Sequence, residues 1–208
     1  MKKNSKSSLF VVLIITLLFL CFYFPNTIAD MKQKQHTLLQ KVTNIQEKGD
    51  FLQSNFALNN QMTGLRAQEI FCIESYSEGN LLSVMAKNKP ILIYRFTKQS
   101  CEKCYIDALT ELQNEIQDGI SANPDFVKVF CSHETEREIL ILKRTHKFSF
   151  PIYRIPPDAF KWVAEESSKP YYFLVHPDMK ISHIYVPDSN YPELNKQYLE
   201  GVKRLITD

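Results

Sequence analysis

The chain has 208 residues, 44% of them hydrophobic and 12% aromatic, which is enough for one domain with its own core and an additional segment at one end. Charged residues make up 23%, the formal net charge is only +2, and no run of five like charges occurs, so nothing indicates a nucleic-acid partner or an acidic substrate. The 5 glycines provide no Gly-rich phosphate-binding loop.

The first 25 residues differ in composition from the rest of the chain. A basic start, MKKNSK, leads into an apolar run from Leu9 to Phe24 in which Thr16 is the polar member. Such a run is at the short end for a membrane span and slightly long for the apolar part of a signal peptide. Pro25 ends the apolar run. We therefore expect a retained signal anchor over residues 1–29, with cleavage of this segment as the alternative.

The charges on either side of the apolar run predict its orientation. Lys2, Lys3 and Lys6 precede it, whereas Lys32 and Lys34, offset by Asp30, follow it. This bias favours an N-terminus in the cytosol. We expect a single pass through the inner membrane, with everything after residue 30 in the periplasm or at the cell exterior, where no cytosolic thiol buffer keeps cysteines reduced.

Residues 30–68 are predicted to form a helical stalk or linker between the anchor (1–29) and a folded domain (69–208). The stretch is rich in Gln, Asn and Lys, and its apolar residues recur at helical spacing until Gly49-Asp50 interrupts them. The spaced apolar residues are Leu38, Leu39, Val42 and Ile45. A polar spacer is the simpler interpretation, and weak self-association through these residues is the alternative.

From residue 69 onward, predicted strands alternate with predicted helices. Strands are expected at 69–74, 90–96, 125–132, 149–155, 171–177 and 181–187, and helices at 80–88, 101–119, 134–148, 156–167 and 191–206. The last two strands are joined by three residues and should form an antiparallel hairpin. This order predicts an α/β domain with a mixed central sheet flanked by helices.

Two cysteines two residues apart, Cys101 and Cys104, fall where the strand 90–96 gives way to a helix. This order places Cys101 at a helix N-terminus, where backbone N–H groups and the helix dipole stabilise a thiolate. A thiolate attacks disulfides, and a second thiol one turn away can resolve the mixed disulfide. We therefore predict a redox pair in which Cys101 attacks and Cys104 resolves, with a structural disulfide or a metal site as alternatives.

Two motifs, KPILIYRFTKQSCEKC and SSKPYYFLVHPDMKISHIY, give the chain a resemblance to the thioredoxin superfamily. It most resembles the membrane-anchored TlpA-type and AhpC/TSA-like branch. The resemblance implies a thioredoxin-like fold with an extra strand–helix unit between Cys104 and Pro170. Pro170 matches the family's cis-proline, which faces the cysteine pair, and Lys169 the residue whose backbone meets a substrate chain.

The same resemblance implies an activity and its partners. It predicts a thiol–disulfide oxidoreductase with catalytic residues Cys101, Cys104 and Pro170 and no cofactor. Its substrate would be a disulfide-bearing protein, and a membrane thiol reductase would supply electrons if the direction is reductive. A metal-binding, metallochaperone-like or partner-binding module on the same fold, without redox turnover, is the alternative function.

Several residues depart from the family pattern. Ser100 stands where tryptophan usually precedes the first cysteine, and Glu102-Lys103 replaces the usual Gly-Pro or Pro-Pro. Arg95 occupies a position six residues before the first cysteine where an acidic or amide residue is common, and Tyr171 replaces a small residue after the proline. The peroxidase motif is also absent, so peroxide reduction is not expected.

The remaining cysteines allow further interpretations. Cys131 and His133 end the next strand, so Cys101, Cys104, Cys131 and His133 are a candidate metal set for zinc or copper. A small apolar core residue is the favoured interpretation of Cys131. A regulatory disulfide between Cys131 and one of the paired thiols is a third possibility. Cys72, in the middle of a predicted strand, is expected in the core.

Overall fold

A computed structural model describes residues 5–67, 89–115, 126–132 and 135–207. The predicted strand at 69–74 with Cys72, the predicted helix at 80–88, the end of the predicted helix at 101–119 and His133 lie outside these residues. By its internal contacts the chain divides into two compact units, Met1–Phe51 and Leu52–Asp208. The predicted boundaries after residues 29 and 68 stay predictions.

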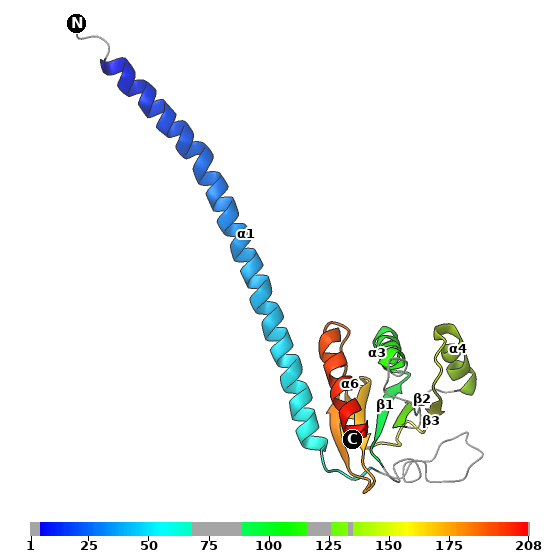
Figure 1. Cartoon of the computed structure of the whole chain (residues 1–208). Coiled ribbons are helices and arrows are strands. Elements are labelled where there is room, and N and C mark those ends of the chain that lie inside the picture. The colour runs from blue at the N-terminus through cyan, green and yellow to red at the C-terminus, as the bar shows by residue number, and fades with distance from the viewer. Residues whose placement is uncertain (1–4, 68–88, 116–125, 133–134, 208) are drawn as a thin grey trace. The chain divides into compact units, whose positions relative to one another are not determined.

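A single long helix, α1, runs from Ser5 to Met62 (Figure 1). The helix therefore continues through Pro25, and the interruption of the helix expected at Gly49 is wrong. A glycine inside an exposed helix costs only about 1 kcal/mol relative to alanine, and here the good helix formers Gln46, Glu47 and Lys48 precede it. A proline inside a helix costs more than a glycine, because it removes one backbone hydrogen bond. The turns on either side of Pro25 keep their hydrogen bonds, so the long helix continues through it.

Within the described part of the chain, no helical stretch combines the length and the apolarity that crossing a membrane requires.

The second unit contains a five-stranded sheet in the order β3-β2-β1-β4-β5. Its strands are β1 (Ile91–Thr97), β2 (Val127–Ser132), β3 (Ile152–Arg154), β4 (Tyr171–Val175) and β5 (Ile181–Tyr185). β1, β2 and β3 are mutually parallel, whereas β4 is antiparallel to both β1 and β5. The predicted mixed sheet and terminal hairpin are thus confirmed, as are two strands between Cys104 and Pro170.

Helices join or follow the strands in the predicted order. They are α3 (Glu102–Glu115), α4 (Glu136–His146), α5 (Val163–Glu166) and α6 (Pro192–Thr207). A capping box between Thr135 and Glu138 starts α4, and Lys147 ends it in the left-handed conformation at φ 56°. Figure 1 shows α3 and α6 side by side against the sheet, and the side chain of Asn195 in α6 reaches Glu111 in α3 at 3.5 Å.

The helix predicted at 156–167 is confirmed only over its last turn, α5. The preceding residues form a turn in which Ala159 N–H donates to the Pro156 carbonyl at 3.1 Å. Phe160 and Trp162 are both buried, and two residues spaced by two cannot share one face of a helix. Burial of these rings in the core therefore outweighs the helical pattern.

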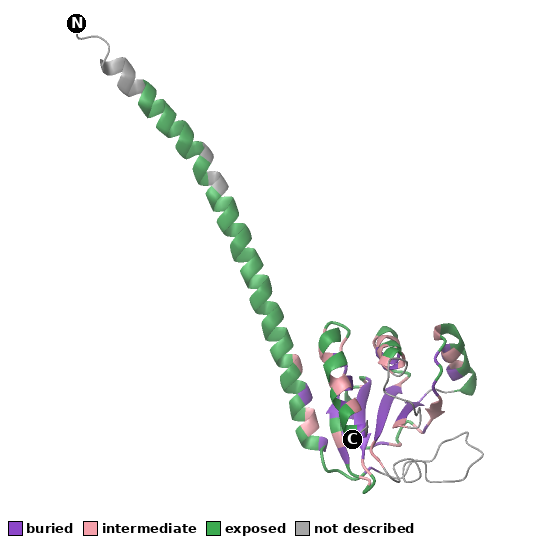
Figure 2. Ribbon diagram, in the orientation of Figure 1, coloured by how far each residue is buried: buried purple, intermediate pink, exposed green. Residues whose placement is uncertain are grey.

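Both faces of the sheet are buried, and Figure 2 shows the buried residues concentrated in the strands. On one face the rings of Tyr94, Phe96, Tyr105 and Tyr172 pack together, with centroid separations of 4.6 to 5.9 Å. The other face holds a cluster of aliphatic and aromatic side chains from β1, β4, β5, the end of α1 and the segment before α5. This two-sided burial explains why β1 and β4 are apolar along nearly their whole length.

The outer edge of β5 is covered by asparagine side chains from the last turns of α1. Asn55 Oδ1 accepts from Val186 N–H at 2.7 Å, and its Nδ2 donates to the Val186 carbonyl at 3.3 Å. Asn59 Oδ1 accepts from Ile184 N–H at 2.9 Å. These amides provide the hydrogen bonds that a sixth strand would make.

Candidate active site

A tight turn carries the chain from β1 to the first cysteine. Ser100 N–H donates to the Thr97 carbonyl at 3.0 Å, and Thr97 N–H donates to Ser100 Oγ at 3.1 Å. Ser100 is 6% exposed. The serine that departs from the family pattern therefore closes this turn with its side chain, which fixes where the helix behind it begins.

Cys101 lies immediately before α3 and caps its N-terminus. Its carbonyl accepts the N–H of Tyr105 at 3.1 Å, and its Sγ accepts the N–H of Cys104 at 3.3 Å. The sulfur thus occupies the position that a serine or aspartate oxygen takes in ordinary N-caps. A negative charge on this atom would be stabilised by the same N–H and by the helix dipole.

Cys101 and Cys104 form a disulfide with a Cα–Cα distance of 5.2 Å. Cys101 is exposed, whereas Cys104 is half-buried beneath it. The predicted pairing is therefore present. The difference in exposure makes Cys101 Sγ the sulfur that an incoming molecule can reach.

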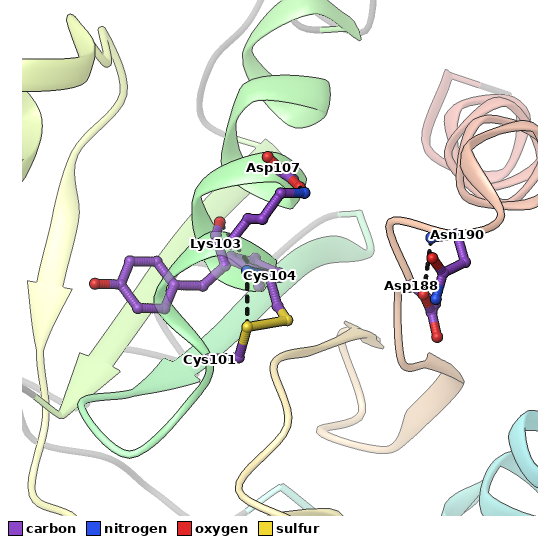
Figure 3. Close-up of a disulfide and its surroundings, with 8 residues drawn as sticks. Cys101, Lys103, Cys104, Asp107, Asp188 and Asn190 are labelled. Carbon is purple, nitrogen blue, oxygen red and sulfur yellow. Dashed lines mark hydrogen bonds and ion pairs between the residues drawn. A yellow bond between two sulfur atoms is a disulfide. The ribbon is translucent and has the colours of Figure 1, made fainter.

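The two charged residues between the cysteines, Glu102 and Lys103, have different environments. Figure 3 shows Lys103 directed along α3 toward Asp107, and its Nζ lies 2.7 Å from Asp107 Oδ2. Glu102 is exposed in the first turn of α3. Since the lysine charge is paired with a carboxylate, the charges of this turn offer little net stabilisation of a thiolate, and the backbone N–H of Cys104 remains the main donor.

The segment before Pro170 lies beside the turn before Cys101. Ser168 Oγ donates to Gln99 Oε1 at 3.5 Å, and Ser168 adopts φ 51°. Pro170 is buried and directly precedes β4, whose first residue, Tyr171, pairs with Arg95 of β1. The fold therefore brings Pro170 and the turn before the cysteine pair to the same end of the paired strands β1 and β4.

No peptide bond among the described residues is cis, so the Lys169–Pro170 bond is trans and the expected cis-proline is wrong. An X–Pro bond favours trans by about 0.5–1 kcal/mol unless its surroundings select cis. Here the left-handed Ser168 turns the chain into β4, and Lys169 N–H donates to Ser167 Oγ at 3.3 Å. Contacts of Lys169 and Pro170 with a substrate stay predictions.

Arg95 is fully buried in β1 and forms a two-pronged ion pair that sequence reasoning missed. Its Nε lies 3.0 Å from Glu165 Oε1 and its Nη2 lies 3.2 Å from Glu165 Oε2. Nη2 also donates to Ser132 Oγ at 2.7 Å, and Nη1 donates to the Phe96 carbonyl at 2.6 Å. The signal for this pair was an arginine within an otherwise apolar strand, which requires a buried acceptor.

Tyr171 connects this ion pair to the segment that contains Pro170. Its hydroxyl donates to Glu165 Oε1 at 2.6 Å. Burial, followed by the charge of Glu165, raises the pKa of Tyr171 well above its usual value, so the hydroxyl keeps its proton. Arg95 and Tyr171, two departures from the family pattern, thus share Glu165 as a partner. Because Glu165 precedes the Ser167–Pro170 segment and Tyr171 follows it, these contacts hold both ends of the segment in place.

The candidate metal set is not assembled among the described residues. Cys101 and Cys104 are bonded to each other, and Cys131 is buried in β2 opposite Phe96. His133 lies outside the described residues. In the part of the chain that the structure covers, no three His, Cys, Asp or Glu side chains are grouped as metal ligands. Cys131 takes part in no disulfide and has the core position that its sequence context favours.

Glu111 of α3 carries a buried oxygen, Oε2, with no hydrogen-bond partner in the described structure. Its other oxygen accepts from Asn195 at 3.5 Å. Burial raises the pKa of Glu111 above its usual value, opposed by the Asn195 hydrogen bond and assisted by Asp107 and Glu115. The folded protein therefore binds this proton more tightly than the unfolded chain does.

This shift predicts a stability that falls as pH rises. The contribution of Glu111 is fully present below the ordinary glutamate pKa and is lost as pH rises through the raised pKa of the folded state. Glu111→Gln, which stays neutral, should unfold at higher urea concentration than the wild type at pH 8, and this difference should shrink toward pH 4. Urea titrations at several pH values measure this, with the exposed Glu193→Gln as control; a pH-independent difference would contradict it.

Comparisons with known proteins place this geometry in a structural context. No protein-family model matches the sequence, and no curated protein matches it. Among solved structures, a thiol:disulfide interchange protein from Bacteroides sp. is similar, with a TM-score of 0.52, 16% identity and coverage of 70% of this chain and 91% of that one.

Two further solved structures show comparable similarity. A proposed protein disulfide isomerase from Bacteroides thetaiotaomicron has a TM-score of 0.53, 18% identity and coverage of 70% of this chain and 91% of that one. A proposed electron transfer protein from Aquifex aeolicus VF5 has a TM-score of 0.50, 18% identity and coverage of 69% and 92%. At these identities the likeness concerns the fold.

Proposed function

Because the domain has a thioredoxin-like fold with a CxxC disulfide at the start of α3, we propose that this protein is a membrane-tethered, extracytoplasmic thiol–disulfide oxidoreductase. One observation carries the proposal. The Sγ of Cys101, an exposed residue, accepts the backbone N–H of Cys104 at a helix N-terminus and is bonded to the sulfur of the less exposed Cys104 one turn away. That arrangement stabilises a thiolate at the sulfur that substrates can reach.

In the reductive direction, the reduced protein transfers two electrons to a substrate disulfide. The Cys101 thiolate attacks one substrate sulfur, forming a mixed disulfide and releasing the other substrate sulfur as a thiolate. The Cys104 thiolate then attacks Cys101 Sγ, which forms the bond seen in this structure and releases the second substrate thiolate. The oxidative direction runs the same steps backward, and neither requires a cofactor.

The tether and the location rest on the composition of the N-terminal part of α1. The described residues from Val11 to Phe24 include many large apolar side chains that are exposed on the helix, among them Ile15 at 59% and Phe19 at 65%. Exposed apolar side chains of this density are stabilised by a lipid environment. With the basic residues before the run, this favours a domain outside the inner membrane.

The proposed partners follow from the chemistry of the dithiol. The substrate is a protein disulfide that reaches Cys101, with Lys169 and Pro170 beside it on the same sheet edge. A similar solved structure is described as a thiol:disulfide interchange protein, which supports a disulfide-bearing partner. If turnover is reductive, a membrane thiol reductase regenerates the reduced pair.

Cys104→Ser provides the direct test, because it removes the resolving thiol and leaves the attacking one. The variant should accumulate mixed disulfides with its substrates, visible as dithiothreitol-sensitive bands of higher mass when membranes are analysed without reductant. The matched control is the double variant Cys101→Ser/Cys104→Ser, which should trap nothing. Equal trapping by the control would contradict the assignment of Cys101 as the attacking thiol.

The alternative function is a metal-binding or partner-binding module with the same fold. It predicts different results for the same protein and variants. Protein reduced and purified without oxygen would then carry stoichiometric zinc or copper that is lost in Cys101→Ser. For a partner-binding module, the Cys101–Cys104 disulfide of the wild-type protein would instead persist under mild reductants. Cys104→Ser would then trap no partner. Either result would favour the binding module over the oxidoreductase.

A further inference from the structure

The middle of α1 carries an apolar stripe with the spacing of a coiled coil rather than of a domain surface. Its residues alternate in steps of three and four, an average of 3.5, which is the heptad repeat. They are Ile28, Met31, Gln35, Leu38, Val42 and Ile45, and we call them the heptad stripe. Gly49 takes the next position of this spacing, which resumes at Leu52 and Phe56.

The apolar members of the heptad stripe are exposed to an unusual degree for a folded protein. Met31 is 62% exposed, Leu38 is 61% exposed and Ile45 is 71% exposed. The contacts of Asn55 and Met62 in the last turns of α1 lie within the second unit, and the heptad stripe contains neither residue. A row of large apolar side chains of this length calls for a partner with the same repeat.

A second copy of this chain fits the stripe, and the residues at its individual positions favour two strands. The repeat puts β-branched Ile28 and Val42 at the positions called a, and Met31, Leu38 and Ile45 at the positions called d. β-Branched residues at a with Leu38 at d are the combination that favours two-stranded coils, and Ile45 departs from it. Gln35 is the single polar residue at an a position between Ile28 and Ile45. A buried polar side chain of this kind aligns two identical helices in one register.

The charges that flank the stripe favour a parallel arrangement. Lys34, Lys41 and Lys48 all occupy the same flanking position, called g, along α1. In a parallel pair each g residue faces the e position of the partner's next heptad, so these lysines meet Leu39, Gln46 and Gln53. In an antiparallel pair g faces g, so the lysines would face one another and repel.

We infer that this protein is a parallel homodimer held by a two-stranded coiled coil through the heptad stripe of α1. Each protomer contributes the same face of its helix, in register, and the two redox domains are carried at the same end of the coil. This inference does not depend on the chemistry of the cysteine pair, because it rests on residues of α1 alone.

Cysteine crosslinking of the full chain in detergent tests the dimer and its orientation. In a Cys21→Ser background, Met31→Cys and Ile45→Cys are each expected to form a disulfide-linked dimer on oxidation with copper phenanthroline. The matched controls are Gln33→Cys and Gln40→Cys, which lie on the opposite face of the same helix and should lose most of that crosslinking. Crosslinking at only one of the two stripe positions would indicate an antiparallel pair and overturn the inference.

A disruption experiment gives an independent measurement. Leu38→Glu/Val42→Glu places carboxylates in the centre of the coil and should convert the dimer to a monomer in analytical ultracentrifugation, while Gln33→Glu/Gln40→Glu should remain a dimer. Circular dichroism and the Cys101–Cys104 reduction rate show whether the domain is still folded. A wild-type chain that sediments as a monomer at the concentrations used for crosslinking would also overturn the inference.

Discussion

Replacing Cys101 by serine is expected to abolish thiol–disulfide exchange, reducing the rate to that of the uncatalysed reaction. A serine hydroxyl at the start of α3 can accept the Cys104 N–H, so the helix remains capped, but it neither forms a disulfide nor ionises near neutral pH. The measurement is the rate of reduction of a fluorescent peptide disulfide by the reduced protein, compared with wild type at equal concentration.

Two companion variants make this result specific. Cys131→Ala changes a buried cysteine that takes part in no disulfide, and it should retain exchange activity if the protein is folded. Alkylation of the reduced wild type with iodoacetamide should modify Cys101 before Cys104, because the first is exposed and the second half-buried. Full activity in Cys101→Ser, or loss only in Cys104→Ser, would assign the attacking role to the other sulfur.

Replacing Arg95 by methionine is expected to destabilise the folded domain by about 3–5 kcal/mol, the usual cost of removing one partner of a buried ion pair. The substitution keeps much of the side-chain volume but leaves Glu165 without its two-pronged partner and Ser132 Oγ without its donor. The free energy of unfolding from urea titration measures the loss.

A double variant and a surface control separate the ion pair from the side chain itself. Arg95→Met/Glu165→Leu removes both charges and should recover part of the loss, since no buried charge is then left without a partner. Lys196→Met, which breaks an exposed pair with Glu200 at 4.0 Å, should change stability by no more than about 1 kcal/mol. A loss in Arg95→Met no larger than that of Lys196→Met would show that the buried pair contributes little.

The sequence predicted those parts of the fold that depend on simple periodicity. The apolar run at 90–96 and the spaced apolar residues after Cys104 correspond to β1 and α3, because both elements bury the face that their pattern defines. The position of the cysteine pair followed from the same two elements. The structure adds that the two cysteines form a disulfide and that Cys101 is the more exposed residue of the pair.

The features that sequence reasoning missed depend on contacts between distant segments. Arg95 and Glu165 are 70 residues apart, and nothing in the local pattern of either one identifies the other. The helix expected at 156–167 is shortened by burial of Phe160 and Trp162, which is a tertiary effect. The bond before Pro170 is trans, although a match to a family motif implied cis.

The asparagine contacts along β5 determine how the domain can be separated from its helix. Without Asn55 and Asn59, the backbone of Ile184 and Val186 would present unsatisfied groups along an open edge. Open edges of this kind pair with one another between molecules and lead to aggregation. A soluble fragment should therefore begin upstream of Leu52, where the second compact unit starts, and not at residue 69, where the sequence pattern alone would place its first residue.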